Sequence, residues 1–479
     1  MIINSDEIKF IDTSLGDETG RVFIWENRVF RAIRNDSSER VKELFSCGLL
    51  YELISKKMFP ESTITEYEIE NYSLIIEHNK ISFVTYPYEW SWSMLKDAAS
   101  LIIEINIVCM KYGYQTKDCH SYNILFDGSR PKFVDLGSFV KRNNKDSGWN
   151  AYEQFLQYYY YPLKIWGNGN MFIAKAVLSE LYEMPHYEYW YYKFPVIRFF
   201  KVAKIRRIIE LCFKLRKISV IARRENYNTK KYAGFLKMAV LFDKLKILPF
   251  QKIDFYKIQN KLAKLTNSKC GDTRWSAYHN AYKDSAGNII PSERFKFVID
   301  LISKYPVYSV VELACNQGIL SILLSRLPQI KKIIATDYDA NAVNVLYNFC
   351  CKNKNDYYSK ITPAVMNCFY PEIVGLCIRP EIRFKSDVVI SLALTHHLIL
   401  RQNIPIEYIF KTFALYTDKY IITEFMPLGM YDGSERSKKV KLPEWYNIEW
   451  FRNAFKKYFN LVIEEKLEIN RILFFGEKI

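Results

Sequence analysis

The C-terminal part of the chain, from Ser292 onward, alternates short apolar runs with stretches whose apolar residues recur at helical spacing. Continuous apolar runs of about four to eight residues are typical of strands buried on both faces. The runs lie at residues 309–313, 332–336, 386–390 and 420–424. Helices between them are the connections that parallel strands require. The pattern predicts a doubly wound, mostly parallel α/β sheet, closed by an antiparallel pair at 459–465 and 471–476.

The N-terminal part has strand-like runs at 21–25 and 28–33, which flank a predicted turn at Glu26-Asn27. Helical spacing follows at 39–58 and 93–112, and residues 150–265 are expected to be helical. This order predicts an α+β domain over residues 1–265, a polar linker or lid at 266–291, and the α/β domain at 292–479. Within the linker, residues 274–279 are interpreted either as a lid over a ligand or as a simple anchor.

The composition is that of a globular protein with two or three domains, since 49% of the 479 residues are hydrophobic and 25% are charged. The ten cysteines include no CxxC pair, which disfavours a zinc site and a disulfide framework and indicates a reducing compartment. The first residues do not resemble a signal peptide, and no apolar stretch is long enough to span a bilayer. We therefore expect a cytoplasmic protein.

The net charge of +16 indicates an anionic partner. Basic residues are concentrated between Arg198 and Lys231, where they are interleaved with isoleucine, leucine and phenylalanine. Such a mixture suits peripheral contact with an anionic inner membrane, or with an anionic, lipid-linked glycan. The alternative is the solvated face of a basic helical lobe. Nucleic acid is disfavoured, because no recognised RNA-binding module accompanies the segment.

The strongest chemical signal is a buried strand that ends at Glu312, a tight loop through Gly318 and a second strand that ends in Asp337. A carboxylate at that position can accept hydrogen bonds from both hydroxyls of a ribose. Phosphate fits less well, because Glu312 is negative and the loop lacks the glycines that admit a pyrophosphate. The motif therefore predicts a site for a neutral or cationic nucleoside, of which S-adenosylmethionine is the common one. The alternative is a βαβ unit without a ligand.

A third buried strand ends near Ser391 and is followed by His396 and His397. Ser391 is assigned to the nucleoside site, because α/β enzymes bind ligands at the carboxyl ends of their strands. A histidine there can take the proton of an attacking hydroxyl, whereas the alternative is that one of the pair packs the following helix. Glu424 ends the next strand and is expected to orient an imidazole or to bind the acceptor, unless it is only structural. The spacing is not that of a metal site.

These residues resemble the class I S-adenosylmethionine-dependent methyltransferases, in the segments 312–318 and 387–397 and at Asp337. The resemblance implies a Rossmann-like fold with S-adenosylmethionine as cofactor. It places Glu312, Asn316 and Gly318 near the methionine moiety and Asp337 on the ribose. Ala314 stands where the family usually has its first glycine, and the added methyl group bears on the affinity for the cofactor.

A second pattern lies at Asp118, Asn123 and Asp135, and it matches phosphotransferases. There, one aspartate orients the acceptor hydroxyl, while the asparagine and the second aspartate hold magnesium against the phosphates of ATP. Residues 1–265 thus resemble a protein-kinase-like or aminoglycoside-phosphotransferase-like fold. Arg34 takes the place of the phosphate-binding lysine, and no glycine-rich loop precedes Val22. A degenerate kinase-derived scaffold, a working kinase that binds ATP and Mg²⁺, and coincidence are the three interpretations.

Both halves together are similar to bacterial NoeA-related methyltransferases, which are associated with nodulation and surface-glycan loci. The resemblance rests on residues 86–98, 117–123 and 392–398. It implies methyl transfer to a small-molecule or glycan acceptor, with an oxygen of a sugar as the expected target and His396 or His397 as the base. The alternatives are a bifunctional kinase and methyltransferase that acts on a polysaccharide terminus, and a non-catalytic, membrane-associated binding protein.

Overall fold

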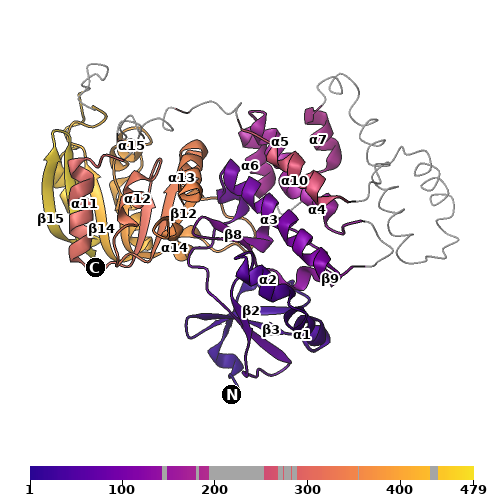
Figure 1. Ribbon diagram of the computed structural model, residues 1–479. Helices are drawn as coiled ribbons and strands as arrows, with labels where there is room; N and C mark the ends of the chain where they lie inside the picture. Colours follow the sequence, from indigo (N-terminus) through magenta and orange to yellow (C-terminus); the bar gives the residue numbers. More distant parts are fainter. Residues whose placement is uncertain are drawn as a thin grey trace. The chain divides into compact units, whose positions relative to one another are not determined.

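The computed structural model in Figure 1 divides the chain into two compact units, each assembled from several segments. Unit 1 comprises residues 1–80, 95–124 and 132–270, and unit 2 comprises residues 81–94, 125–131 and 271–479. The residues that the structure describes are 1–142, 148–179, 183–193, 253–267, 273, 282, 289–353, 355–431 and 441–479. The basic segment from Arg198 to Lys231 and the predicted lid at 274–279 lie outside these residues.

Unit 1 begins with a five-stranded antiparallel sheet in the order β1-β2-β3-β5-β4. The strands are β1 (Lys9–Phe10), β2 (Gly20–Trp25), β3 (Arg28–Ile33), β4 (Ser62–Ile64) and β5 (Leu74–His78). The predicted hairpin is confirmed, and Glu26 and Asn27 both take positive φ, as a tight two-residue turn requires. The helix predicted at 39–58 is wrong in one respect. It is divided into α1 (Ser38–Ser46) and α2 (Leu49–Ser55), because Gly48 takes φ 87°.

The rest of unit 1 is largely helical where it is described (Figure 1). Its helices include α3 (Trp92–Lys111, which enters unit 1 at Leu95), α4 (Tyr152–Phe155), α5 (Tyr161–Gly167), α6 (Met171–Ser179), α7 (His186–Lys193) and α10 (Phe255–Ala263). A two-stranded sheet joins β6 (Tyr114–Thr116) to β9 (Phe139–Lys141). Among the described residues, no helix is both long and apolar enough to cross a bilayer.

Unit 2 contains a seven-stranded sheet in the order β12-β11-β10-β13-β14-β16-β15. The strands are β10 (Ser309–Leu313), β11 (Lys332–Asp337), β12 (Ile361–Val365), β13 (Ser386–Ser391), β14 (Thr417–Phe425), β15 (Phe459–Glu468) and β16 (Arg471–Lys478). The first five are parallel, and β16 is antiparallel to both β14 and β15. The predicted mostly parallel sheet with an antiparallel closing pair is confirmed. Strand β12 was not predicted, because Pro363, which is typical of an edge strand, interrupts its apolar run.

Helices cover both faces of this sheet, because successive strand residues point to opposite sides. Val310 packs in a core with α11 (Glu293–Lys304), α12 (Ile319–Leu324) and α13 (Ala340–Lys352), which Figure 1 shows in front of the sheet. Its neighbour Val311 packs in the opposite core with α15 (Thr395–Leu400), α16 (Ile406–Leu415) and α17 (Ile448–Phe455). The strands are therefore buried on both sides, which explains why their sequences are continuous apolar runs.

Two short segments from the N-terminal half belong to unit 2, unlike the predicted boundaries at 265 and 292. In the first, the 3-10 turn Pro87–Glu89 places Glu89 against Arg383, at the end of α14 (Pro380–Arg383). The second is the turn between β7 (Ile124–Asp127) and β8 (Arg130–Phe133). A Cβ on Gly128 in that turn would lie 1.9 Å from the Ser359 carbonyl oxygen, so the turn packs closely on unit 2.

Candidate nucleoside site and its flanking histidines

The loop after β10 has a backbone that few sequences allow. Ala314, Asn316 and Gly318 take φ values of 60°, 53° and 66°, in the left-handed region that non-glycine residues rarely adopt. A Cβ on Gly318 would lie 2.5 Å from Leu346 Cδ2, so a larger residue would require the Leu346 side chain to move. Gly318 then caps the start of α12. The motif residues are therefore brought together at the carboxyl end of β10, as predicted.

Asp337 joins this loop to the end of β11. Its Oδ2 accepts from the Asn316 amide at 2.8 Å, and its Oδ1 accepts from the Asp339 amide at 2.8 Å. Burial raises the pKa of Asp337 to about 6. An ionised carboxylate has about four acceptor positions, so two backbone bonds leave capacity for a ribose diol. The contact of Asp337 with a ribose stays a prediction, and these two bonds leave acceptor capacity for it.

Glu312 points into the protein. Its Oε2 accepts from the Ser321 amide at 3.0 Å and from the Ser321 hydroxyl, both in α12. Burial raises the pKa of Glu312 to about 7. These bonds anchor α12 to the end of β10, and the contact of Glu312 with a methionine moiety stays a prediction.

The residues that follow β12 were not predicted as part of the site. The Met366 amide donates to the Asp337 carbonyl oxygen at 2.8 Å, so this segment adjoins the nucleoside site. The next residue, Asn367, is half-buried, and its Oδ1 accepts from the amides of Phe369 and Tyr370 at 3.0 and 3.2 Å. Had residues 361–365 been predicted as a strand, the residues at its carboxyl end would have been candidates for the site.

The raised pKa of Asp337 predicts a pH-dependent site. Below about pH 6 the carboxyl is protonated and loses acceptor capacity, so the affinity for S-adenosylhomocysteine is expected to rise as the pH increases through about 6. The contribution to stability has the opposite sign, because a carboxyl whose pKa is raised on folding favours the folded state at low pH. Calorimetric titrations on either side of this pH test the affinity. Asp337→Asn should remove the part of the dependence centred near pH 6, and an affinity that falls with rising pH would contradict the assignment.

The end of β13 leads into the two histidines. Ser391 is buried, and its hydroxyl has no hydrogen-bond partner among the described residues. His396 and His397 lie in the first turn of α15, with their ring centroids 4.2 Å apart. His396 is only 4% exposed, and burial lowers its pKa to about 3, whereas His397 is half-buried. The two neighbours therefore have different environments and should have different roles.

Glu424 lies near this turn but makes other bonds than predicted. It is 1% exposed, and its Oε2 accepts from the Ala393 amide at 2.9 Å and from Arg471 Nη1 at 2.9 Å. Arg294 Nη1 donates to both carboxylate oxygens, at 3.3 and 3.4 Å. The carboxylate thus bonds to two arginines and a backbone amide instead of to an imidazole.

Unit 1 contains the second predicted cluster, with a different arginine. Asn123 Nδ2 donates to Asp135 Oδ2 at 3.3 Å, whereas Asp118 accepts from the His120 amide in its own loop. Arg34, the predicted phosphate ligand, is exposed. A different arginine, Arg31, which was not predicted, lies near Asp135. Arg31 is 7% exposed, its Nη1 lies 3.8 Å from Asp135 Oδ1, and it forms an ion pair with Asp17.

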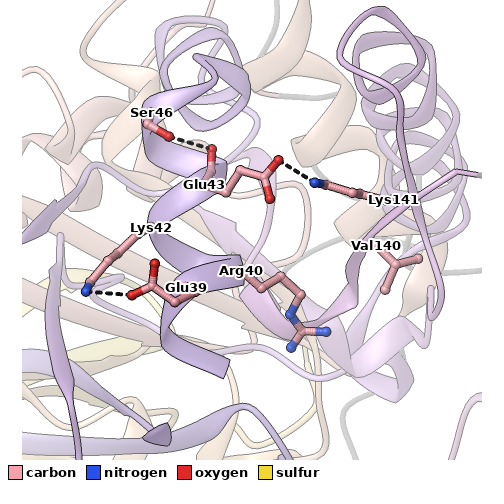
Figure 2. Close-up of a pocket in the computed structure, with 7 residues that line it drawn as sticks. All are labelled: Glu39, Arg40, Lys42, Glu43, Ser46, Val140 and Lys141. Atoms are coloured by element: carbon pink, nitrogen blue, oxygen red, sulfur yellow. Dashed lines mark hydrogen bonds and ion pairs between the residues drawn. The ribbon is translucent and has the colours of Figure 1, made fainter. Parts of the chain in front are cut away.

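A pocket of about 660 Å³ also lies in unit 1, beside α1 and β9 (Figure 2). Its lining residues are Glu39, Arg40, Lys42, Glu43, Ser46, Val140 and Lys141. Lys141 and Glu43 form an ion pair at 2.7 Å, and Lys42 and Glu39 form another at 3.0 Å. The pocket includes none of the predicted site residues. In the part of the chain that is described, no group of three or more His, Cys, Asp or Glu side chains is arranged to hold a metal ion.

Comparison with known proteins gives one curated relative and several structures. The chain is 24% identical over 443 residues to the nodulation protein NoeA of Rhizobium meliloti (strain 1021), across 86% of this chain and 84% of that protein. The PH0226 protein of Pyrococcus horikoshii OT3 is 16% identical and covers 44% of this chain and 100% of its own, with a TM-score of 0.33. A SAM dependent methyltransferase from Aquifex aeolicus is 12% identical and covers 43% of this chain and 98% of its own, with a TM-score of 0.30. No family model matches the chain.

Unit 2 has the fold that the resemblance to S-adenosylmethionine-dependent methyltransferases implies, a mostly parallel, doubly wound sheet with an antiparallel closing strand. The kinase-like fold of unit 1 stays a prediction. The chain is similar to NoeA along most of its length, and its second unit has a methyltransferase-type architecture.

Proposed function

We propose that the protein transfers the methyl group of S-adenosylmethionine to an oxygen of a sugar or surface-glycan intermediate. The observation that supports this most directly is the arrangement of Asp337 and the left-handed loop after β10 at the carboxyl edge of a doubly wound sheet. The site is lined by Asp337 and has no basic side chain in the loop 314–318, which suits a cationic nucleoside better than a phosphate.

Bound S-adenosylmethionine would supply an electrophilic methyl group. Asp337 would hold the ribose, and the loop from Ala314 to Gly318 would align the group with an acceptor oxygen. Alignment contributes much of the rate enhancement, because in-line attack needs the reacting atoms within a narrow range of distance and angle. When the oxygen–methyl bond forms and the sulfur–methyl bond breaks, the hydroxyl proton must pass to a base.

His397 is the better candidate for that base. A general base works best when its pKa lies near the working pH. Burial holds the pKa of His396 at about 3, so His396 stays neutral and is only weakly basic. His397 is half-buried in the same helical turn, so solvent and acceptor can reach it more readily. We therefore assign proton acceptance to His397 and a packing role to His396.

The sugar or glycan acceptor is supported by the similarity to a nodulation protein, together with the sequence resemblance described above. The test is transfer of a radiolabelled methyl group from S-adenosylmethionine to glycan fractions of the source cells. The wild-type protein should label carbohydrate, His397→Gln should not, and His396→Gln should retain partial activity. Label only in lipid or protein fractions would contradict a glycan acceptor.

A second candidate function, phosphoryl transfer by unit 1, is favoured by one observation. The side chains of Asn123 and Asp135, the two residue types that hold magnesium in phosphotransferases, are hydrogen-bonded to each other, and Arg31 lies beside Asp135. The nucleotide would be ATP with Mg²⁺, and the whole protein would then be a bifunctional kinase and methyltransferase.

The ion pair between Asp17 and Arg31 makes this second function testable. Asp17 neutralises the guanidinium that a phosphate would need, so the wild-type protein is expected to bind magnesium-ATP weakly. Asp17→Asn should tighten binding about tenfold or more, because the competing carboxylate is removed. Glu18→Gln is the matched control, since Glu18 is an exposed neighbouring acid that pairs only loosely with Lys117 at 3.9 Å. Calorimetry that shows no difference between the two variants would dismiss a nucleotide site at Arg31.

A further inference from the structure

Glu424 is connected to both ends of the turn that leads to the histidines. Its side-chain Oε2 accepts from the Ala393 amide at 2.9 Å, and its own carbonyl oxygen accepts from Thr395 Oγ1 at 2.6 Å. Residues 392–394 link β13 to α15, whose first turn begins at Thr395 and contains His396 and His397. We infer that Glu424 is a positioning residue that sets the histidine-bearing turn, and that Arg294 and Arg471 hold Glu424 in place for this task.

The turn needs such a restraint. Ala393 takes φ 52°, a conformation that an alanine does not prefer and that persists only when surrounding contacts enforce it. The bond from the Ala393 amide to Glu424 is one such contact, and the buried hydroxyl of Thr395 provides the second. Together they determine where α15 begins, and hence where the two imidazoles lie.

The two arginines that hold the carboxylate come from elements far apart in the sequence. Arg294 lies in α11 and is 2% exposed, and its Nη1 approaches both oxygens of Glu424. Arg471 begins β16, and its Nη1 donates to Oε2 at 2.9 Å while its Nε donates to Glu468 at 3.0 Å. With Oε1 and Oε2 both engaged, the carboxylate cannot rotate without losing a charged hydrogen bond.

The role inferred for Glu424 rests on the proposed methyl transfer, because the turn matters only if one of its histidines serves the reaction. Glu424 acts through that turn and makes no bond to Asn316, Gly318 or Asp337 among the contacts of the described residues. A substitution of Glu424 that keeps its charge beside Arg294 should therefore disturb the imidazoles and leave the nucleoside site intact.

The test is nuclear magnetic resonance of the full chain with labelled histidine, whose six imidazoles include His396 and His397. Substitutions at these two positions assign their signals. Glu424→Asp keeps the charge that balances the arginines but withdraws the carboxylate from the Ala393 amide, and Thr395→Val removes the second bond without changing any charge. Both variants should shift the signals of His396 and His397. Glu468→Gln is the matched control, because Glu468 also pairs with Arg471 but is exposed, and it should leave these signals unchanged.

Wild-type signals in both Glu424→Asp and Thr395→Val would overturn the inference, and so would an equal shift in Glu468→Gln. The thermal stability of each variant and its affinity for S-adenosylhomocysteine are measured on the same samples, and that affinity should not change. If the wild-type protein fails to bind S-adenosylhomocysteine, the proposed function fails, whatever the histidine signals show. The two failures are therefore distinguishable.

Discussion

Replacing Glu89 by glutamine is expected to destabilise unit 2 by about 3–5 kcal/mol, since breaking one side of a buried ion pair leaves an uncompensated charge. Glu89 is 2% exposed and Arg383 is 9% exposed. The pair is bidentate, with Arg383 Nη2 and Nη1 at 2.6 and 3.0 Å from the two carboxylate oxygens. The guanidinium also stacks over Tyr86 and Phe384, 4.4 Å from each ring centroid, so it has no route to solvent.

Hydrogen exchange of the β13 amides is the suitable measurement, because a chain with two units need not unfold in one step. Asp418→Asn is the matched control. Asp418 pairs with Lys385 at 2.6 Å, but both side chains are exposed, so the change should cost no more than about 1 kcal/mol. If the β13 amides exchanged as slowly in Glu89→Gln as in the control, residues 81–94 would not be an integral part of unit 2.

Replacing Asp337 by asparagine is expected to weaken S-adenosylhomocysteine binding about 10–100-fold, the equivalent of the 1.5–3 kcal/mol typical of a hydrogen bond to a charged group. Asparagine keeps the shape and one acceptor oxygen but loses the charge and the capacity to accept from two hydroxyls. The backbone bonds from Asn316 and Asp339 can partly survive, so the variant should fold.

Asp339→Asn provides the control for this second variant. Asp339 is the N-cap of α13, and its Oδ1 accepts from the amides of Asn341 and Ala342, a capping role that asparagine performs equally well. Its Oδ2 accepts from the Thr273 hydroxyl. Isothermal titration should therefore show wild-type affinity for Asp339→Asn. Equal affinity in Asp337→Asn and the wild-type protein would remove Asp337 from the ligand site.

The sheet of unit 2 was predictable because burial on both faces makes each central strand a continuous apolar run. Edge strand β12 escaped prediction, since Pro363 breaks the run and is tolerated only where a ladder is open on one side. In unit 1, the left-handed Gly48 divides a helix that apolar spacing alone predicted as one. The spacing of apolar residues thus predicted the central strands. It failed where a single proline or glycine interrupts that spacing.

Some residues of the candidate site were likewise predictable from the sequence, and others were not. Asn316, Gly318 and Asp337 were found because they are close in sequence to two strand ends. Arg31 was missed in favour of Arg34, and strand alternation could not say which of them faces Asp135. The arginines that hold Glu424 are distant in sequence, Arg294 by 130 residues and Arg471 by 47, so only the folded chain reveals them.

The decisive measurement is calorimetric titration of the protein with S-adenosylhomocysteine, with magnesium-ATP as a parallel ligand. We expect one S-adenosylhomocysteine to bind per chain, independently of magnesium and about 10–100-fold more weakly in Asp337→Asn. Absence of binding by the folded wild-type protein, or binding that Asp337→Asn leaves unchanged, would contradict this expectation.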